Sequence, residues 1–119
     1  MKTHKDLTVY QESINLVEMI YKITYSFPKH ELFNLTSQLR RASVSIPSNI
    51  SEGATRKSKK EFQRFLYISL GSLSEAETQL EIACRLKYIT EFDEIKLKAV
   101  YIRRMILKLI ESLNRVVTE

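Results

Sequence analysis

The chain has 119 residues, of which 44% are hydrophobic and 28% are charged, and its formal net charge is +5 at pH 7. This composition is that of one globular domain over residues 1–119, and it excludes an intrinsically disordered chain. The single cysteine, Cys84, excludes an internal disulfide framework, and no apolar run approaches the ~18 residues that a membrane span requires. The first residues also lack an apolar signal-peptide core, so we expect a cytoplasmic protein with no membrane partner.

The first predicted helix runs from about Val9 to Ser26, and it ends because the residue before Pro28 is pushed out of the helical region. Its apolar side chains recur at intervals of three and four residues, at Leu16, Val17, Ile20, Ile23 and Phe27. Glycine and proline occur only twice each, which favours long helices over a fold built from strands and turns.

The second predicted helix runs from about Glu31 to Ala54 and contains Pro47 in its interior. Its apolar stripe consists of Leu32, Leu35, Leu39, Ala42, Ile46 and Ile50. A proline inside a helix costs about 3 kcal/mol relative to alanine, and it leaves the Ser43 carbonyl without its usual partner. We therefore predict a bend at Pro47, with nearby hydroxyl groups or Asn49 satisfying the freed backbone groups.

The third predicted helix begins at a capping box, in which the Ser58 hydroxyl accepts from the Glu61 N–H, and it ends near Tyr88. Its stripe consists of Phe62, Phe65, Leu66, Ser69, Leu73, Ala76, Leu80 and Ala83. The fourth helix opens at Thr90 or Glu91, and its stripe consists of Ile95, Ala99, Ile102, Ile106, Leu109 and Leu113. Short connections between four such helices predict an all-α, antiparallel up-down-up-down four-helix bundle.

The third and fourth helices carry more apolar residues than one core needs: Leu70, Ile82, Leu86, Leu97, Val100, Tyr101 and Leu107. A second apolar strip on a small bundle indicates a subunit interface, although scattered apolar side chains are also normal on protein surfaces. Gly71 lies within the third helix, where glycine costs ~1 kcal/mol, so we expect it to mark tight packing between helices.

The many serines of the second helix raise the hypothesis of a hydrolase, but a catalytic serine needs a base and an orienting group. The two histidines, His4 and His30, show no partner arrangement in the sequence. No CxxC, HxxxH or Glu-x-x-His pattern indicates a metal, and no glycine-rich loop indicates a nucleotide phosphate. We therefore expect no enzyme activity, no catalytic residue, no metal and no cofactor, and we expect the serines to pack helices and to bond the backbone.

Five cations within nine residues form the strongest binding signal: Arg56, Lys57, Lys59, Lys60 and Arg64. Lysines in the first turn of the third helix oppose its positive N-terminal dipole, whereas a phosphate would be attracted by both the charges and the exposed N–H groups. We predict a nucleic-acid-binding site here, extended by Arg40, Arg41 and basic side chains of the fourth helix. The equally weighted alternative is a solvated charged face.

Two blocks of sequence follow Phe27-Pro28 and Glu31-Leu32-Phe33: LTSQLRRASVSIPSNISEG and FQRFLYISLGSLSEAETQLEIA. Their combination resembles the bacterial four-helix bundle family named for proteins encoded in 23S rRNA intervening sequences. The resemblance covers nearly the whole chain and implies a homo-oligomer, a pentamer arranged as a barrel around a central channel. A similar fold occurs in the accessory protein of diversity-generating retroelements, a basic pentamer that engages nucleic acid and a reverse transcriptase.

From these observations we expect a non-enzymatic, pentameric bundle that binds RNA or DNA through repeated basic patches, which strengthen one another by avidity. The alternative is a protein-interaction scaffold or assembly factor, in which the basic charge serves an acidic protein partner or solubility. The sequence contains no helix-turn-helix motif and no aromatic RNA platform, so the expected binding is led by phosphate contacts.

Overall fold

The computed structural model describes residues 7–118, with side chains as far as Asn114. Its four long helices are α1 (Thr8–Thr24), α2 (Leu35–Ala54), α3 (Lys59–Arg85) and α4 (Asp93–Thr118), and a short 3-10 helix, η2 (Lys29–Glu31), precedes α2. This part of the chain contains no strand, so the predicted all-α class with four helices is confirmed. None of its helices is long and apolar enough to cross a membrane.

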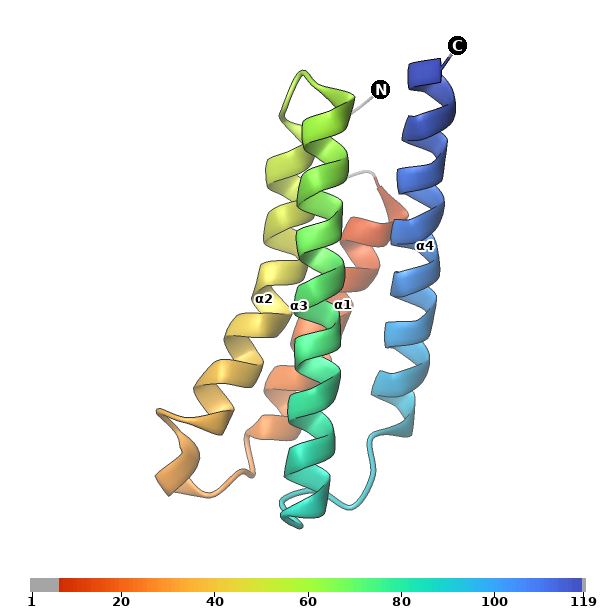
Figure 1. Cartoon of the computed structure of the whole chain (residues 1–119). Coiled ribbons are helices and arrows are strands. Elements are labelled where there is room, and N and C mark those ends of the chain that lie inside the picture. Colours follow the sequence, from red (N-terminus) through yellow and green to blue (C-terminus); the bar gives the residue numbers. More distant parts are fainter. Residues whose placement is uncertain (1–6, 119) are drawn as a thin grey trace.

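The four helices form a closed set of neighbours, in which α1 contacts α2, α2 contacts α3, α3 contacts α4 and α4 contacts α1. The most extensive of these contacts is between α2 and α3. Figure 1 shows the α2–α3 connection at the same end of the molecule as the labelled termini, with the α1–α2 and α3–α4 connections at the other end. The two ends of the bundle are therefore built from different connections.

The predicted apolar stripes form most of the core. All eight stripe positions of α3, from Phe62 to Ala83, are buried, as are the α2 residues Leu39, Ala42, Ile46 and Ile50. Leu32 departs from the prediction, because the chain forms η2 before α2 begins and leaves this side chain 47% exposed. Small polar side chains also enter the core, where Ser13 and Thr24 donate hydrogen bonds to the carbonyls of Val9 and Ile20.

The serines and Asn49 around Pro47 bond to neighbouring backbone groups. The Asn49 amide donates to the Ser45 carbonyl at 2.8 Å, and the Ser69 hydroxyl of α3 donates to the Ile46 carbonyl at 3.0 Å. These bonds reach the Ser45 and Ile46 carbonyls rather than the Ser43 carbonyl that Pro47 frees, and the bond from Ser69 ties this turn of α2 to α3. This arrangement agrees with a packing and backbone-bonding role for Ser69.

The two glycines have opposite surroundings. Gly53 is buried in the last turn of α2, where an added Cβ would lie 2.8 Å from the Phe65 Cβ and 2.9 Å from the Phe62 ring. It therefore permits close approach of α2 and α3 beside their connection. Gly71 is exposed, and an added Cβ would meet no neighbouring side chain of the described residues within 4 Å. The prediction that Gly71 marks tight packing between helices is wrong for the protomer. The close approach of α2 and α3 occurs at Gly53 instead.

Candidate functional site

The five clustered cations lie in the α2–α3 connection and the first two turns of α3. We call Arg56, Lys57, Lys59, Lys60 and Arg64 the basic turn. The predicted helix cap is confirmed, because the Glu61 N–H donates to the Ser58 Oγ at 3.2 Å. Lys59 and Lys60 are the first two residues of α3, and all five side chains of the basic turn are exposed.

The two arginines of the basic turn are held in place by carboxylates and by one ring. Arg56 Nη2 lies 2.8 Å from Glu52 Oε2, and Arg64 Nη2 lies 3.2 Å from Glu61 Oε1. Both guanidinium groups lie over the Phe65 ring, at 5.1 Å and 4.5 Å from its centroid. The hydrogen bonds from Arg64 also lower the pKa of Glu61 below its usual range, which keeps this carboxylate ionised.

The three lysines of the basic turn differ from its arginines in having no carboxylate partner among residues 7–114. Glu52 and Glu61 offset the charges of the two arginines, so Lys57, Lys59 and Lys60 carry the excess positive charge. Lys59 and Lys60 also carry the backbone N–H groups of the first turn of α3 that Ser58 does not cap. The arrangement provides mobile point charges beside backbone donors, which together suit a phosphate group.

Arg40 and Arg41 lie apart from the basic turn. Arg41 precedes the end of α2 by 13 residues, or about 20 Å along the helix axis. The Arg40 Nε donates to the Thr24 Oγ1 at 2.9 Å, and its guanidinium lies over the Tyr21 ring of α1. Arg41 lines a separate polar cleft between α2 and α3. The structure thus divides the predicted site residues into the basic turn and two other locations.

Three basic residues of α4 make contacts within the protomer, whereas Arg104 and Lys108 are exposed. Lys98 pairs with Glu12 of α1, and Arg103 pairs with Glu77 of α3. Lys96 lies over the Phe92 ring at 4.6 Å from its centroid. These contacts join α4 to its neighbours, so the side chains of Lys98 and Arg103 are occupied in a way that those of the basic turn lysines are not.

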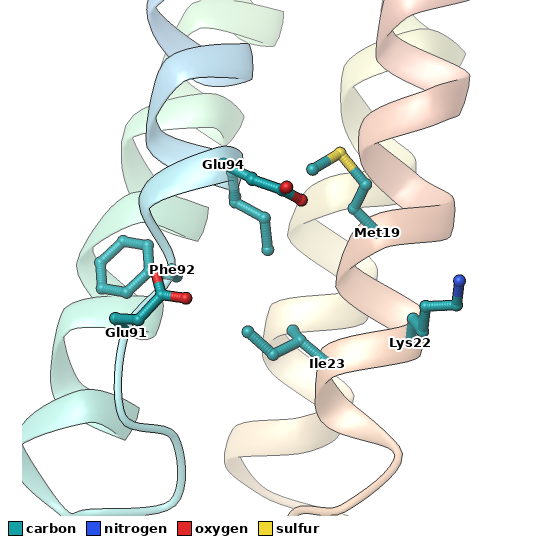
Figure 2. A pocket seen from close by; sticks show the side chains of 7 residues that line it. Met19, Lys22, Ile23, Glu91, Phe92 and Glu94 are labelled. Atoms are coloured by element: carbon teal, nitrogen blue, oxygen red, sulfur yellow. The ribbon is translucent and has the colours of Figure 1, made fainter.

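An open apolar groove between α1 and α4 was not apparent as a single feature of the sequence. A cavity of about 400 Å³ lies between α1 and the start of α4, and Figure 2 shows Met19 of α1 and Glu94 of α4 pointing toward one another across it, with Ile23 beside them. A neighbouring cavity of about 580 Å³ shares Met19 and Glu94 and adds Leu97, Lys98 and Tyr101. The Leu97 side chain is 72% exposed and the Tyr101 side chain is 49% exposed, so the groove carries large open apolar surfaces of α4.

The serine hydroxyls and the His30 imidazole are the groups that a catalytic site would need, and the structure places them apart from one another. Ser45 and Ser72 hydrogen-bond to each other at 2.8 Å, whereas His30 lies beside Tyr88, with 3.4 Å between the imidazole Nε2 and the phenol oxygen. The Ser43 hydroxyl donates to the Arg40 carbonyl. Within the described residues, no group of three or more His, Cys, Asp or Glu side chains is placed to hold a metal ion.

Comparison with known proteins gives one family match. Curated proteins provide no match to the chain. The family model described as 23S rRNA-intervening sequence protein matches residues 5–108, which include all of α1, α2 and α3 and most of α4. The four-helix structure fits this assignment, and the sequence resemblance is confirmed. The chain belongs to the 23S rRNA-intervening sequence protein family.

Proposed function

We propose that this protein is a non-enzymatic, cytoplasmic, homo-oligomeric bundle that binds RNA or DNA through the basic turn. The observation that carries the proposal is the set of three exposed lysines without carboxylate partners at the start of α3. The charges of Lys59 and Lys60 oppose the helix dipole when no ligand is present, at a cost of roughly 0.3–1 kcal/mol each. A bound phosphate removes this repulsion and accepts hydrogen bonds from the free N–H groups of the same turn.

The expected mode of binding is contact with the phosphate backbone. Lysine contributes point charges on flexible stems, so the basic turn has little means of reading the order of bases. Each phosphate contact releases counterions, which lowers the slope of log affinity against log salt by about 0.7 for single strands and about 0.9 for duplex DNA. Several copies of the basic turn in one oligomer would add avidity to these weak contacts.

The test replaces the three lysines with glutamine and leaves Arg56, Arg64 and their contacts with Phe65 intact. The triple variant Lys57→Gln/Lys59→Gln/Lys60→Gln is expected to bind labelled RNA and DNA oligonucleotides at least about tenfold more weakly at moderate salt. A matched control, Lys22→Gln/Lys96→Gln/Lys108→Gln, removes the same charge from α1 and α4 and should retain most of the affinity.

Equal affinities of the wild type and the lysine variant would exclude the basic turn as the site. Equal losses in both triple variants would show that net charge alone drives binding. Recovery of one protein partner from nuclease-treated lysate, without any bound nucleic acid, would favour the scaffold alternative. Anisotropy of labelled oligonucleotides measures the first two outcomes directly.

We propose further that the protomer is an antiparallel up-down-up-down bundle and that five copies form the assembly. The α1–α4 groove supports self-association, because Leu97 and Tyr101 leave large apolar surfaces exposed along it. Light scattering should give a mass near five times the 14.0 kDa of the chain. The double variant Leu97→Gln/Tyr101→Gln should reduce that mass, and a wild-type mass of 14.0 kDa would contradict the assembly.

The bend of α2 at Pro47 is part of the same proposal. Pro47 has no N–H to donate, and its ring crowds the preceding turn, so the helix axis should change direction there. The carbonyl that Pro47 leaves without a donor is that of Ser43, one turn earlier. A crystal structure in which α2 runs straight through Pro47 would contradict the bend.

A further inference from the structure

A small cavity lies at the end of the bundle opposite the basic turn, where the α1–α2 connection packs against the start of α2. This α1–α2 cavity has a volume of about 230 Å³. Tyr25, Phe27 and Leu32 provide its aromatic and apolar walls, and Pro28 lies between them in the connection. Its size and flat apolar walls fit one ring system better than a large organic ligand.

The charged residues that line the α1–α2 cavity are both cations. Lys29 lies on η2, and Arg40 reaches the cavity from the second turn of α2. The bond to Thr24 and the stacking on Tyr21 fix the Arg40 side chain through its Nε and its flat face. Among the described residues no carboxylate lines this cavity, so its potential favours an anion.

A buried hydroxyl beside the α1–α2 cavity lacks a hydrogen-bond partner. Thr36 lines the cavity and is only 3% exposed, and its Oγ1 has no partner among the described residues. A buried hydroxyl without a partner is unfavourable, and threonine has two accessible rotamers in a helix. Rotation of this side chain would give a polar ligand in the cavity both a donor and an acceptor.

One aromatic wall of the α1–α2 cavity is almost fully accessible from outside. The Tyr25 side chain is 88% exposed while it lines the cavity. Phe33, in the same connection, is equally exposed but does not line the cavity. An accessible ring beside cations is the arrangement on which bases of single-stranded nucleic acids stack.

We propose that the α1–α2 cavity binds one nucleotide of a single-stranded nucleic acid. The base stacks on Tyr25, and Lys29 and Arg40 hold the phosphate. The Thr36 hydroxyl forms a hydrogen bond with the polar edge of the base. The inference rests on the proposed nucleic-acid binding but assigns a second site, at the opposite end of the bundle from the basic turn. The basic turn then attracts the strand, and the cavity holds one of its unpaired bases.

The first test uses adenosine 5′-monophosphate as the probe and saturation-transfer NMR on the full chain. Stacking plus charged hydrogen bonds should give a dissociation constant on the order of 1 mM. Transfer to the base protons is expected for the wild type and for the control Phe33→Ala, and a loss of at least about fivefold is expected for Tyr25→Ala. Because Tyr25 is exposed, circular dichroism should show an unchanged fold in that variant.

This first test separates the cavity from the basic turn. The Lys57→Gln/Lys59→Gln/Lys60→Gln variant should still bind the mononucleotide, even if its affinity for strands is lost. If no saturation is transferred from the wild-type protein to the base protons, the cavity site is overturned, while the proposal for the basic turn stays intact. If the wild type binds no mononucleotide and the mass of the assembly falls in Tyr25→Ala, the cavity is a contact with a second copy, and the inference is overturned.

The second test distinguishes a strand from a free nucleotide. Tyr25→Ala should weaken binding of an unpaired oligonucleotide by about 5-fold or more without changing the salt slope, since the phenol ring carries no charge. Lys29→Gln should lower the affinity and make the slope of log affinity against log salt shallower by about 0.7. Unchanged strand affinity in Tyr25→Ala, with mononucleotide binding lost, would overturn the strand as the occupant.

Discussion

The two ends of the bundle present positive charge in different ways. At the basic turn three lysines extend into solvent, and the nearby ring of Phe65 is buried beneath two arginines. At the α1–α2 cavity the charges are fewer, one arginine is fixed in place, and the Tyr25 ring is accessible. The first arrangement suits attraction of a strand, and the second suits direct contact with a base.

This difference has a consequence for salt dependence. Exposed charges act over about 10 Å at 0.1 M salt, and their contribution falls steeply as salt rises. Stacking of a base on an aromatic ring depends little on salt. Binding that remains at high salt should therefore depend on Tyr25, whereas the steep part of the curve should depend on the lysines of the basic turn.

The largest expected change in stability comes from Gly53→Ala, at the end that carries the basic turn. The new methyl group would lie 2.8 Å from the Phe65 Cβ, which cannot swing aside because it is fixed to the backbone of α3. Overpacking costs about 1–3 kcal/mol, and the gain in helix propensity offsets about 1 kcal/mol of it. Denaturant unfolding should show a net loss of up to about 2 kcal/mol, and a gain in stability would contradict the close approach of α2 and α3.

A change of opposite sign is expected at the α1–α2 cavity from Thr36→Val. Valine keeps the shape of threonine and replaces the buried hydroxyl that lacks a partner. The free energy of unfolding should rise by about 1 kcal/mol, while binding of adenosine 5′-monophosphate should weaken. If Thr36→Val is less stable and binds the nucleotide as well as the wild type does, the Thr36 hydroxyl is neither an unpaired buried group nor a contact of the nucleotide.

Gly71→Ala provides a reference between the two ends. Its methyl group would meet no neighbouring side chain, so the protomer should gain about 0.5–1 kcal/mol from helix propensity alone. Binding by the basic turn and by the cavity should both stay unchanged. A clear fall in the mass of the assembly, measured by light scattering, would show that this exposed part of α3 is covered by another copy.

The smallest expected effect is a difference in pH dependence. A hydrogen bond from Tyr88 lowers the pKa of Glu31, and Arg64 lowers that of Glu61, so both carboxylates contribute stability above about pH 4.3 that is lost as pH falls through the lowered values. Glu31 in turn raises the pKa of Tyr88, which adds stability below about pH 10 that is lost as pH rises through the raised value.

Tyr88→Phe therefore tests the cavity end alone. The variant should be less stable than the wild type near neutral pH. Its stability should also decline less than that of the wild type in acid and in alkali. The Glu61–Arg64 pair would still respond to acid. Thermal midpoints measured across this pH range check the expectation, and an alkaline decline identical to that of the wild type would contradict it.

The sequence predicted the core better than the surfaces. The α3 stripe was found correctly because eight positions follow one helical period through an uninterrupted element. The capping bond of Ser58 was found because it depends on residues three positions apart. The start of α2 was misplaced, because η2 satisfies local backbone bonds before the helix begins, and this left Leu32 exposed.

Features that depend on two elements were harder to predict. The sequence shows that both glycines lie in helical segments, but only the packing of α2 on α3 shows that Gly53 is crowded and Gly71 is not. Arg40 looked like an extension of the basic cluster, yet the fold places it between Tyr21 and Thr24. The accessible ring of Tyr25 is not indicated by the sequence, because the predicted first helix includes this position off its apolar stripe, whereas α1 ends at Thr24.

The most direct test of the central claim is the salt dependence of oligonucleotide binding, compared between the wild type and the Lys57→Gln/Lys59→Gln/Lys60→Gln variant. If these lysines contact phosphates, the slope of log affinity against log salt should be shallower by about 2 for a short single strand. Parallel lines with equal affinities would contradict nucleic-acid binding by the basic turn.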